Sequence, residues 1–468
     1  MPVYRGVDFV EETLRSILAQ TYQDFHLVMS VDGPDDPTFE ICRKYTDDPR
    51  VDAVVQDPRL GWPGNLNWLI RSCDREFFCY WQQDDLASTG YLEALLEELT
   101  RRPDAAIAYT DVQWFGKAFH REGTPSIEGN ALSRVMQNIE AIRFEPFRGL
   151  MRASMLPEGP EPIPVTPYES HQEEFVFLTK MAAAGSFIRC PDAMYFKRLH
   201  GENAFVRWQG FPDWQRRRGW VSMGAGMYEI ARNLAPPGLR PRVLGQLLDR
   251  LAVRRHGRGH FYDPPQSPLE FQRLVRDFVA YADVGPEDLG DAQAEPPPLE
   301  RPVHQEIVRA IQFERKTAGE RFELRDHLAT NHELTVDVGD ERLMALLGYG
   351  WSNPESWGVW SDGEHATIRI PAPAGTAWEA ILHGHPYAPR GPVRVGIGAE
   401  SGSLDYTEVQ PGEPLSLTAR ARGQSRPLVQ LHLPAARSPV ADGLSQDSRV
   451  LGFGLTHLGF SLLDKPTL

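Results

Sequence analysis

Cysteine is scarce in this sequence, and the spacing of the few cysteines excludes two classes of small, cross-linked fold. Four cysteines occur among 468 residues, at positions 42, 73, 79 and 190. None belongs to a Cys-x-x-Cys pair, so neither a zinc-finger pattern nor a disulfide framework is indicated. Reduced thiols are typical of a reducing compartment, and we therefore expect a cytoplasmic protein.

Long apolar runs and positive charge are also missing. No stretch of about 18 apolar residues and no signal peptide occur, so we expect a soluble chain with at most peripheral contact at the inner face of a membrane. The formal net charge of −15 argues against a nucleic-acid partner. A short basic run at 216–218 reads as a solvated helix face, with contact to an anionic membrane or substrate as the alternative.

The length predicts two or three domains, because single hydrophobic cores stop growing at about 250 to 300 residues. In residues 1–208, strand and helix patterns alternate, which favours an α/β fold with a mostly parallel sheet. Residues 209–330 contain amphipathic helical segments, and residues 331–468 contain short alternating runs typical of an all-β sandwich. The strands expected in the first region are 25–31, 51–55, 76–81 and 104–112, and the expected helices are 8–22 and 90–100.

Acidic residues follow three of the expected strands. Asp32 comes after the strand 25–31, the adjacent pair Asp84 and Asp85 comes after 76–81, and Asp111 lies at the end of 104–112. Ligands of open α/β sheets bind beyond the carboxyl ends of strands. Adjacent carboxylates repel each other unless a cation or hydrogen-bond donors compensate, and Mg²⁺ prefers such oxygen ligands. The pair therefore indicates either a metal–diphosphate site or the N-cap of the helix that follows.

Five segments in order resemble the family 2 glycosyltransferases of the GT-A fold. They are "PVYRG", "SILAQTYQDF" followed by a strand and "VDGPDDPT", "LGWPGNLN", "YWQQDDLAS" and "SHQEEFVFLTKMAAAGSFIRCPDAMYFKRLH", and they cover about residues 1 to 208. The resemblance implies a Rossmann-like GT-A domain that binds a nucleotide-sugar, with a helical connecting region and a β-sandwich module appended to it.

The resemblance also implies roles for residues on the donor side. Asp32 would accept a hydrogen bond from the nucleotide base, and Pro2 and Tyr4 would lie beside the same nucleotide. Asn67 would close the turn on the nucleotide side. Gln82 stands where the family has the first aspartate of its signature, and it could donate to ribose or phosphate without adding charge.

The metal and the base follow from the same comparison. Asp84 would face the sugar, and Asp84 or Asp85 would hold a divalent cation, Mg²⁺ or Mn²⁺, with His200 close to the diphosphate. Glu174 takes the place of the family's catalytic aspartate, and Glu173 would be the structural acid of that pair. One base and one cation suit a single displacement with inversion at the anomeric carbon. A solvated helix start is the alternative reading of the two glutamates.

Three other regions leave expectations open. Arg148 and Arg152 could meet an anionic acceptor group, or they could be surface residues. The family has an apolar strand before the position of Pro2, so we expect the true start to lie upstream of Met1. In the C-terminal part, Trp351, Trp357 and Trp360 either stack on sugar rings or belong to a core.

The sequence thus predicts a metal-dependent, inverting hexosyltransferase. It would transfer a sugar from a UDP-sugar to a hydroxyl of a bacterial surface glycan or a lipid-linked glycan. A non-catalytic glycan-binding or scaffold protein is the main alternative. A sugar-1-phosphate nucleotidyltransferase is a weaker one, because the N-terminus has no Gly-rich loop bearing Arg or Lys.

Overall fold

The contacts of the chain divide it into two compact units. The structure is a computed structural model that describes residues 1–117, 119–166, 173–201, 203, 208, 210–252, 265–290, 305–337, 339–400, 402–424, 427–447 and 449–463. Unit 1 comprises residues 1–211 and 226–235, and unit 2 comprises residues 212–225 and 236–468. The boundaries 1–208, 209–330 and 331–468 therefore stay predictions, and the helices after 236 group with the C-terminal strands.

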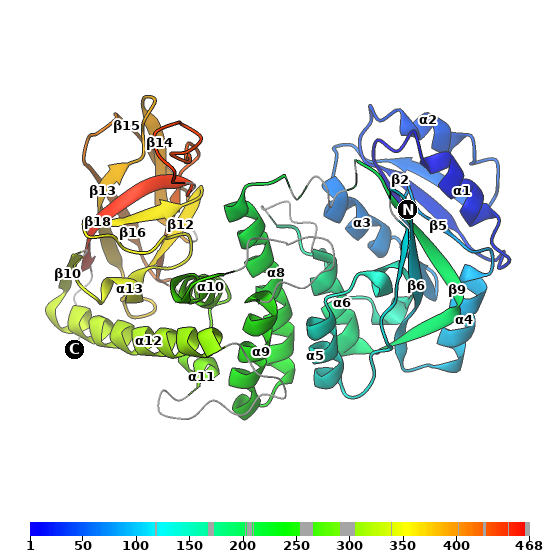
Figure 1. Cartoon of the computed structure of the whole chain (residues 1–468), viewed down its shortest axis with the longest axis horizontal. Coiled ribbons are helices and arrows are strands. Elements are labelled where there is room, and N and C mark those ends of the chain that lie inside the picture. Colours follow the sequence, from blue (N-terminus) through cyan, green and yellow to red (C-terminus); the bar gives the residue numbers. More distant parts are fainter. Residues whose placement is uncertain are drawn as a thin grey trace. The chain divides into compact units, whose positions relative to one another are not determined.

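Unit 1 begins with a small parallel sheet covered by helices (Figure 1). Its strands are β1 (Pro2–Val3), β2 (Leu27–Val31) and β3 (Val51–Val55), and its helices are α1 (Val10–Leu18), α2 (Thr38–Arg43) and α3 (Gly61–Arg71). Both pairings, β1 with β2 and β2 with β3, are parallel. The predicted strands 25–31 and 51–55 and the helix within 8–22 are confirmed.

The second sheet of unit 1 corrects the expectation of a mostly parallel arrangement. Its order is β4-β8-β6-β9-β5 with β7 beside β6, and only the β6–β9 pairing is parallel. Of the unforeseen strands in this sheet, β5, β7 and β8 have only two or three residues and are too short to carry a hydrophobic period, whereas β9 has 14 residues. The strands are β4 (Phe77–Cys79), β5 (Leu86–Ala87), β6 (Ala105–Gly116), β7 (His120–Glu122), β8 (Leu150–Arg152) and β9 (Ser186–Leu199).

The described residues of this unit also contain three further helices, two 3₁₀ turns and the second half of the helix 213–234. The three helices and two turns are α4 (Tyr91–Arg101), α5 (Ala131–Ala141), η1 (Glu145–Arg148), η2 (Ala153–Met155) and α6 (Glu173–Ala184). One hydrophobic core joins the two sheets to α1 and α4, and Leu14, Met29, Leu95, Ala108 and Tyr195 are among its buried members. This core fixes the ends of β2, β4 and β9, where the polar residues of interest lie.

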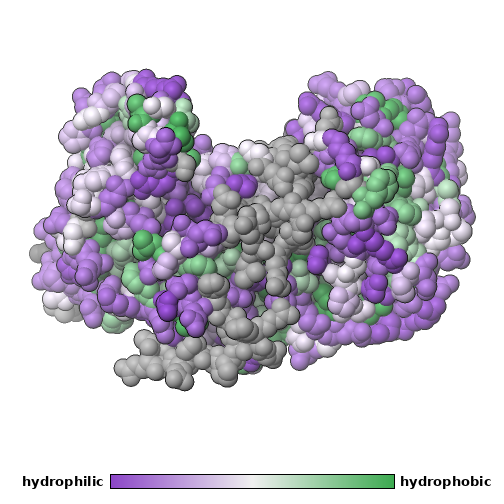
Figure 2. Space-filling view, viewed as in Figure 1, coloured by the Kyte–Doolittle hydropathy of each residue, from purple (hydrophilic) through white to green (hydrophobic). Residues whose placement is uncertain are grey.

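The described residues between 209 and 330 are largely helical, as expected, while the bounds of this region stay a prediction. It contains α8 (Asp213–Leu234), η3 (Pro237–Leu239), α9 (Arg240–Ala252), α10 (Pro268–Tyr281), α11 (Pro286–Leu289) and α12 (Gln305–Asn331). Among the described residues, none of the helices combines the length and the apolar character that crossing a membrane requires. On the face drawn in Figure 2, hydrophobic residues form small groups between hydrophilic ones.

The C-terminal strands form the predicted β-sandwich. One antiparallel sheet has the order β10-β18-β13-β16 with β11 beside β18, and the other has the order β12-β17-β14-β15. The elements are β10 (Glu333–Asp337), α13 (Leu343–Leu346), β11 (Val359–Asp362), β12 (His365–Arg369), β13 (Trp378–Pro386), β14 (Val393–Ala399), β15 (Asp405–Val409), β16 (Leu415–Ala421), β17 (Leu428–His432) and β18 (Leu451–Leu462). Trp351 is fully buried between the sheets, so it is a core residue and cannot stack on a sugar.

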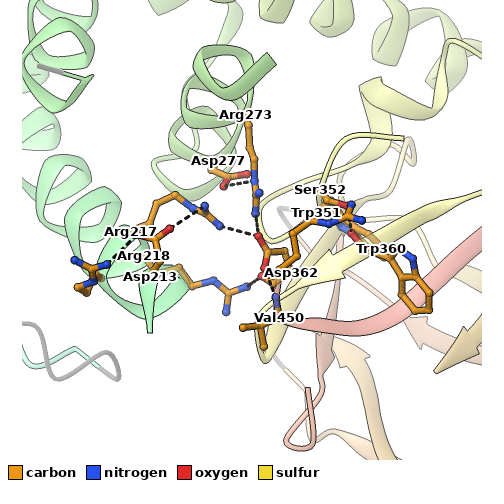
Figure 3. A network of polar contacts seen from close by, with 12 residues as sticks. Asp213, Arg217, Arg218, Arg273, Asp277, Trp351, Ser352, Trp360, Asp362 and Val450 are labelled. Atoms are coloured by element: carbon orange, nitrogen blue, oxygen red, sulfur yellow. Dashed lines mark hydrogen bonds and ion pairs between the residues drawn. The ribbon is translucent and has the colours of Figure 1, made fainter. Parts of the chain in front are cut away.

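A buried carboxylate joins the helices of unit 2 to its sandwich (Figure 3). Asp362, at the end of β11, pairs with Arg217 of α8 at 3.2 Å and with Arg273 of α10, and it accepts the backbone N–H of Val450 at 3.0 Å. Arg218 donates to the backbone carbonyl of Asp362. The basic run at 216–218 is therefore not simply a solvated helix face, because Arg217 and Arg218 are used inside this unit.

Replacing Asp362 with Asn should strongly destabilise unit 2. The amide keeps the shape of the carboxylate but leaves Arg217 and Arg273 with only their longer ion pairs, to Asp213 at 3.7 Å and to Asp277 at 4.0 Å. Breaking a buried pair in this way costs about 3 to 5 kcal/mol. Asp340→Asn, which removes the half-exposed pair with Arg342, is the control and should cost at most about 1 kcal/mol. Urea unfolding of the full chain measures both, and equal shifts would contradict this account.

The same carboxylate should make unit 2 sensitive to acid. Burial opposes ionisation of Asp362, but the charges of Arg273 and Arg217 outweigh it, so its pKa lies below the usual 3.8. A folded-state pKa below the unfolded value means that this stabilisation is present above pH 4 or so and is lost as the pH falls further.

Candidate active site

The two adjacent carboxylates lie between β4 and β5, and the structure gives them different surroundings. Asp85 is fully buried, accepts a hydrogen bond from the Tyr195 hydroxyl at 3.1 Å and another from the Arg198 backbone N–H at 2.9 Å. Lys197 Nζ lies 3.7 Å from the same carboxylate. Burial raises the pKa of Asp85. Both oxygens bind β9, so Asp85 anchors the loop and does not fit its predicted place as a metal ligand.

Asp84 has a different arrangement, with one oxygen left over. Its Oδ2 lies 2.8 Å from His200 Nε2 and 3.3 Å from Asn203 Nδ2. Within the part of the chain that the structure describes, its Oδ1 makes no hydrogen bond. Burial raises the pKa of Asp84, but the hydrogen bond with His200 and the charge of Lys197 outweigh it, and the net shift is downward. Asp84 is thus an ionised carboxylate with one available oxygen.

The side chains of Gln82 and Lys197 are hydrogen-bonded to each other beside this loop. The side-chain Oε1 of Gln82 accepts a hydrogen bond from Lys197 Nζ at 2.8 Å. Burial lowers the pKa of Lys197, although Asp85 opposes the shift. Gln82 therefore holds the lysine close to the two aspartates, and its predicted contact with ribose or phosphate stays a prediction.

Glu174 is a half-buried carboxyl group in the first turn of α6. Its side chain makes no hydrogen bond and no ion pair with any residue that the structure describes. Burial raises its pKa to about 8, with Arg148 opposing and Glu173 adding to the shift. Glu173 is buried, and its Oε1 accepts a hydrogen bond from Thr166 Oγ1 at 2.7 Å. The two glutamates thus differ, since Glu173 is held in place and Glu174 is available to a substrate.

Arg148 places a positive charge near Glu174 and Asp85, and part of its guanidinium finds no hydrogen-bond acceptor among the described residues. Its side chain lies in η1 with its guanidinium 5.0 Å from the centre of the Tyr80 ring, and only 5% of the residue is exposed. Nε and Nη1 are buried and have no acceptor among the described residues. Arg148 also acts electrostatically on Glu174 and Asp85. A buried guanidinium without an acceptor is costly, and an anionic group of a substrate would relieve that cost.

Arg152 does not share this environment, and its predicted contact with an acceptor stays a prediction. Its guanidinium donates to the backbone carbonyls of Leu99 at 2.8 Å and Ala105 at 3.3 Å, and it lies over the Phe77 ring. The bond to Leu99 satisfies one of the last carbonyls of α4, which the helix cannot satisfy itself, and the bond to Ala105 reaches the start of β6. Arg152 is therefore a structural residue of the β4–β8 edge.

Asp32 lies at the carboxyl end of β2, as predicted, and is buried there. It accepts a hydrogen bond from the Leu60 backbone N–H at 2.7 Å and one from Arg59 Nε at 3.2 Å. The Arg59 guanidinium lies 3.9 Å from the centre of the Tyr4 ring. Asp32 and Tyr4 are therefore brought together through Arg59. Pro2 pairs with Ser30 one strand away.

Asn67 has a structural task that the sequence did not reveal. Its Nδ2 donates to the carbonyl of Ile163 and its Oδ1 accepts from the N–H of the same residue, both at 2.8 Å. The amide is buried and fully used by these two bonds. Asn67 thus fixes the segment around Ile163 to α3, and its predicted place on the nucleotide side stays a prediction.

Sequence reasoning missed Arg59 and Lys197. Lys197 lies in "FKRLH", and the available signal was a run of cations at the end of a strand in a chain with adjacent carboxylates elsewhere. Nothing in the sequence pairs Lys197 with Gln82, which is 115 residues away. Arg59 follows β3 in a loop, where an arginine is ordinarily solvated.

Comparison with known proteins identifies the class of unit 1. The family described as "Glycosyl transferase family 2" matches residues 1–155. Over residues 1–155, the N-terminal part of this chain is therefore similar to family 2 glycosyltransferase domains.

Particular relatives are distant. The chain is 29% identical to an uncharacterized glycosyltransferase of Rickettsia typhi over 101 residues, which is 22% of this chain and 31% of that protein. It is 21% identical to an uncharacterized glycosyltransferase of Haemophilus influenzae over 207 residues, which is 42% of this chain and 64% of that protein. The chain thus spans less than two thirds of both relatives. The crystal structure of S. aureus TarS 1-349 shares 14% identity at a TM-score of 0.44, covering 70% of this chain and 85% of that one.

Proposed function

We propose that the protein is a metal-dependent, inverting glycosyltransferase that uses a UDP-sugar as donor and a glycan hydroxyl as acceptor. One observation carries the proposal. Near Asp84, the described residues group three side chains: Asp84, with one carboxylate oxygen that accepts no hydrogen bond from them, Arg148, whose Nε and Nη1 find no acceptor among them, and Glu174, whose carboxyl group forms no pair with them. These are the charges that a transfer from a nucleotide diphosphate needs.

The residues present fit a divalent cation bound through Asp84. Mg²⁺ and Mn²⁺ take one or two carboxylates and complete their shells with water and substrate phosphates. Asp84 Oδ1 offers one such ligand, and His200 holds the other oxygen in place at 2.8 Å. When bound, the cation would neutralise charge on the leaving diphosphate. Lys197 and Arg148 are the chain's own cations for the same charge.

Glu174 is the base of the proposal. It would take the proton of the acceptor hydroxyl as the oxygen attacks the anomeric carbon. A single base and a single displacement invert that carbon. Because burial raises the pKa of Glu174 to about 8, its deprotonated form is a stronger base than an exposed glutamate.

Donor and acceptor classes come from the family resemblance. Asp32, with Arg59 and Tyr4 beside it, is proposed to receive the uracil base. The acceptor would be a bacterial surface glycan or a lipid-linked glycan, and the reaction would take place in the cytoplasm or at the inner face of the membrane. The free thiols at Cys42, Cys73, Cys79 and Cys190 are compatible with that compartment.

Release of UDP tests the proposal. The purified full chain with Mn²⁺ or Mg²⁺ should release UDP from at least one UDP-sugar, slowly with water and faster with an acceptor glycan. Excess EDTA should remove this activity, and added Mn²⁺ should restore it. GDP-sugars serve as the matched donor control. Calorimetry should likewise show UDP binding that depends on the cation. If UDP bound neither with Mn²⁺ nor with Mg²⁺, the proposal would be contradicted.

A non-catalytic glycan-binding role is the second candidate, and one feature of the sandwich favours it. Trp357 is 37% exposed and lies edge to face with Trp360, with ring centres 5.1 Å apart. His385 lies 5.1 Å from both rings. A partly exposed aromatic group can stack on sugar faces. Titrating the same chain with oligosaccharides separates the roles, because glycan binding without any UDP binding supports only this candidate.

A further inference from the structure

The four-stranded sheet of the sandwich carries a group of three potential metal ligands that the proposed reaction does not use. Glu364, His365 and His432 each offer a nitrogen or a carboxylate oxygen, and these three atoms lie within 4.8 Å of one another. All three residues are partly exposed. The group lies in unit 2, whereas the catalytic residues proposed above belong to unit 1.

The backbone of the sheet accounts for the close approach of the two histidines. His365 of β12 and His432 of β17 are direct partners in the antiparallel register. The Leu433 N–H donates to the Glu364 carbonyl at 2.7 Å, so residues 364 and 433 form a hydrogen-bonded pair of the antiparallel ladder. Residues 365 and 432 therefore form a non-hydrogen-bonded pair, in which the two Cα atoms lie closer together. Side chains are closest at such pairs. The two rings accordingly stack with their centres 4.6 Å apart.

A bend before β12 brings the carboxylate to the histidines. Neighbouring residues of a strand point to opposite faces, so Glu364 and His365 would normally diverge. Glu364 lies in the bend that follows Gly363, whose φ of +97° is favoured for glycine alone. Neither the Glu364 carboxylate nor the His365 ring has a hydrogen-bond partner among the residues that the structure describes. Two of the three ligand groups are therefore available.

The third ligand, His432, is held in its orientation by a hydrogen bond with the Tyr406 hydroxyl. The Tyr406 hydroxyl lies 2.6 Å from His432 Nδ1, which leaves Nε2 for another partner. Tyr406 reaches His432 across β14, where Gly396 stands between them in the register. A Cβ at position 396 would come within 2.7 Å of the Tyr406 ring, so only glycine permits this crossing. Histidine ligands of metals typically have the other ring nitrogen hydrogen-bonded in this way.

We propose that Glu364, His365 and His432 bind a Zn²⁺ ion, with Tyr406 as the outer partner of His432. Two imidazoles and one carboxylate suit zinc, and three protein ligands leave a fourth position for water or another ligand. Small side-chain rotations bring the stacked rings from their present arrangement to a shared ion. Arg218 acts on His365 as a positive charge and opposes the ion, so binding depends on the negative charge of Glu364.

The experiment measures Zn²⁺ binding to the full chain by calorimetry, with excess Mg²⁺ present to occupy oxygen-only sites. We expect one Zn²⁺ per chain. His432→Ala and His365→Ala should each weaken binding at least about 100-fold, and Glu364→Gln and Tyr406→Phe about 10- to 100-fold. Co²⁺ in place of Zn²⁺ gives a second readout, because the absorption of tetrahedral Co²⁺ reports the ligands directly.

The sandwich supplies its own control. His383 of β13 and His457 of β18 also stack, with ring centres 4.0 Å apart, but they have no carboxylate in a comparable ligand group among the described residues. His383→Ala should leave Zn²⁺ binding unchanged. The proposal is overturned if the wild-type chain binds no Zn²⁺, if His432→Ala binds as well as wild type, or if His383→Ala loses the same site. Unfolding temperatures of the metal-free variants separate loss of a ligand from loss of the fold.

Discussion

Glu174→Gln should lower sugar transfer by about 100- to 10,000-fold, which is the range expected for loss of a general base. The amide has the size of the carboxyl group but cannot accept the proton of the acceptor. Binding of UDP should change little, because Arg59, Asp32 and Asp84 are untouched. The measurement is kcat for transfer to a glycan, together with the Kd for UDP with Mn²⁺.

The raised pKa of Glu174 adds a pH signature to this prediction. Wild-type kcat/KM should rise about tenfold per pH unit on the acid side and level off near pH 8, since the pKa is about 8. The residual activity of Glu174→Gln should lack that rise. Glu174→Asp restores a carboxylate about one methylene further away and should recover part of the rate. Wild-type rates in Glu174→Gln would refute the assignment.

As the pH rises, the folding stability of the chain should fall while its activity rises. The folded-state pKa of Glu174 lies above its ordinary 4.5, so the folded chain holds this proton more tightly than the unfolded chain. Stability therefore falls as the pH rises from about 4.5 to 8. Glu174→Gln removes that loss and should unfold at a higher temperature than wild type above pH 8. A catalytic group held against its own solvation commonly has this cost.

Much of the fold could be predicted because its signals are local. The strands 27–31 and 51–55 are apolar runs between turn residues, and the helix 91–101 has leucines at helical spacing. The antiparallel pairings of the second sheet could not be predicted, because they depend on β5 and β8, which have two and three residues. Segments of that length become strands only through neighbours distant in sequence, such as β9 for β5.

The candidate site divides in the same manner. Sequence found the acidic loop and the glutamate pair, because carboxylates next to strand ends and helix starts are visible locally. It could not separate Asp84 from Asp85, since the difference lies in Tyr195 and Arg198, more than 100 residues away. The bonds of Asn67 to Ile163 were hidden for the same reason, because the two residues are 96 positions apart. Residue type predicted the chemistry, and long-range contacts decided which residue is available for it.

Asp84→Asn should lower metal-dependent transfer by at least about 100-fold, because removing the charge that holds the cation forfeits several kcal/mol of stabilisation of the leaving group. The concentration of Mn²⁺ required for half-maximal rate should rise at the same time. His200 keeps a hydrogen-bond acceptor in the Asn side chain, so the loop should retain its shape. Rates measured against Mn²⁺ concentration separate weaker metal binding from a slower chemical step.

A second aspartate–histidine pair provides the matched control for Asp84. Asp52 lies 2.9 Å from His26 on an exposed part of β3, against 2.8 Å between Asp84 and His200. Asp52→Asn should leave both the rate and the Mn²⁺ dependence unchanged. Asp85→Asn should instead lower the unfolding temperature, because the buried carboxylate that compensates Lys197 is lost. If Asp84→Asn merely reproduced the instability of Asp85→Asn with an unaltered Mn²⁺ dependence, then the pair would be a structural anchor and the cation would bind elsewhere.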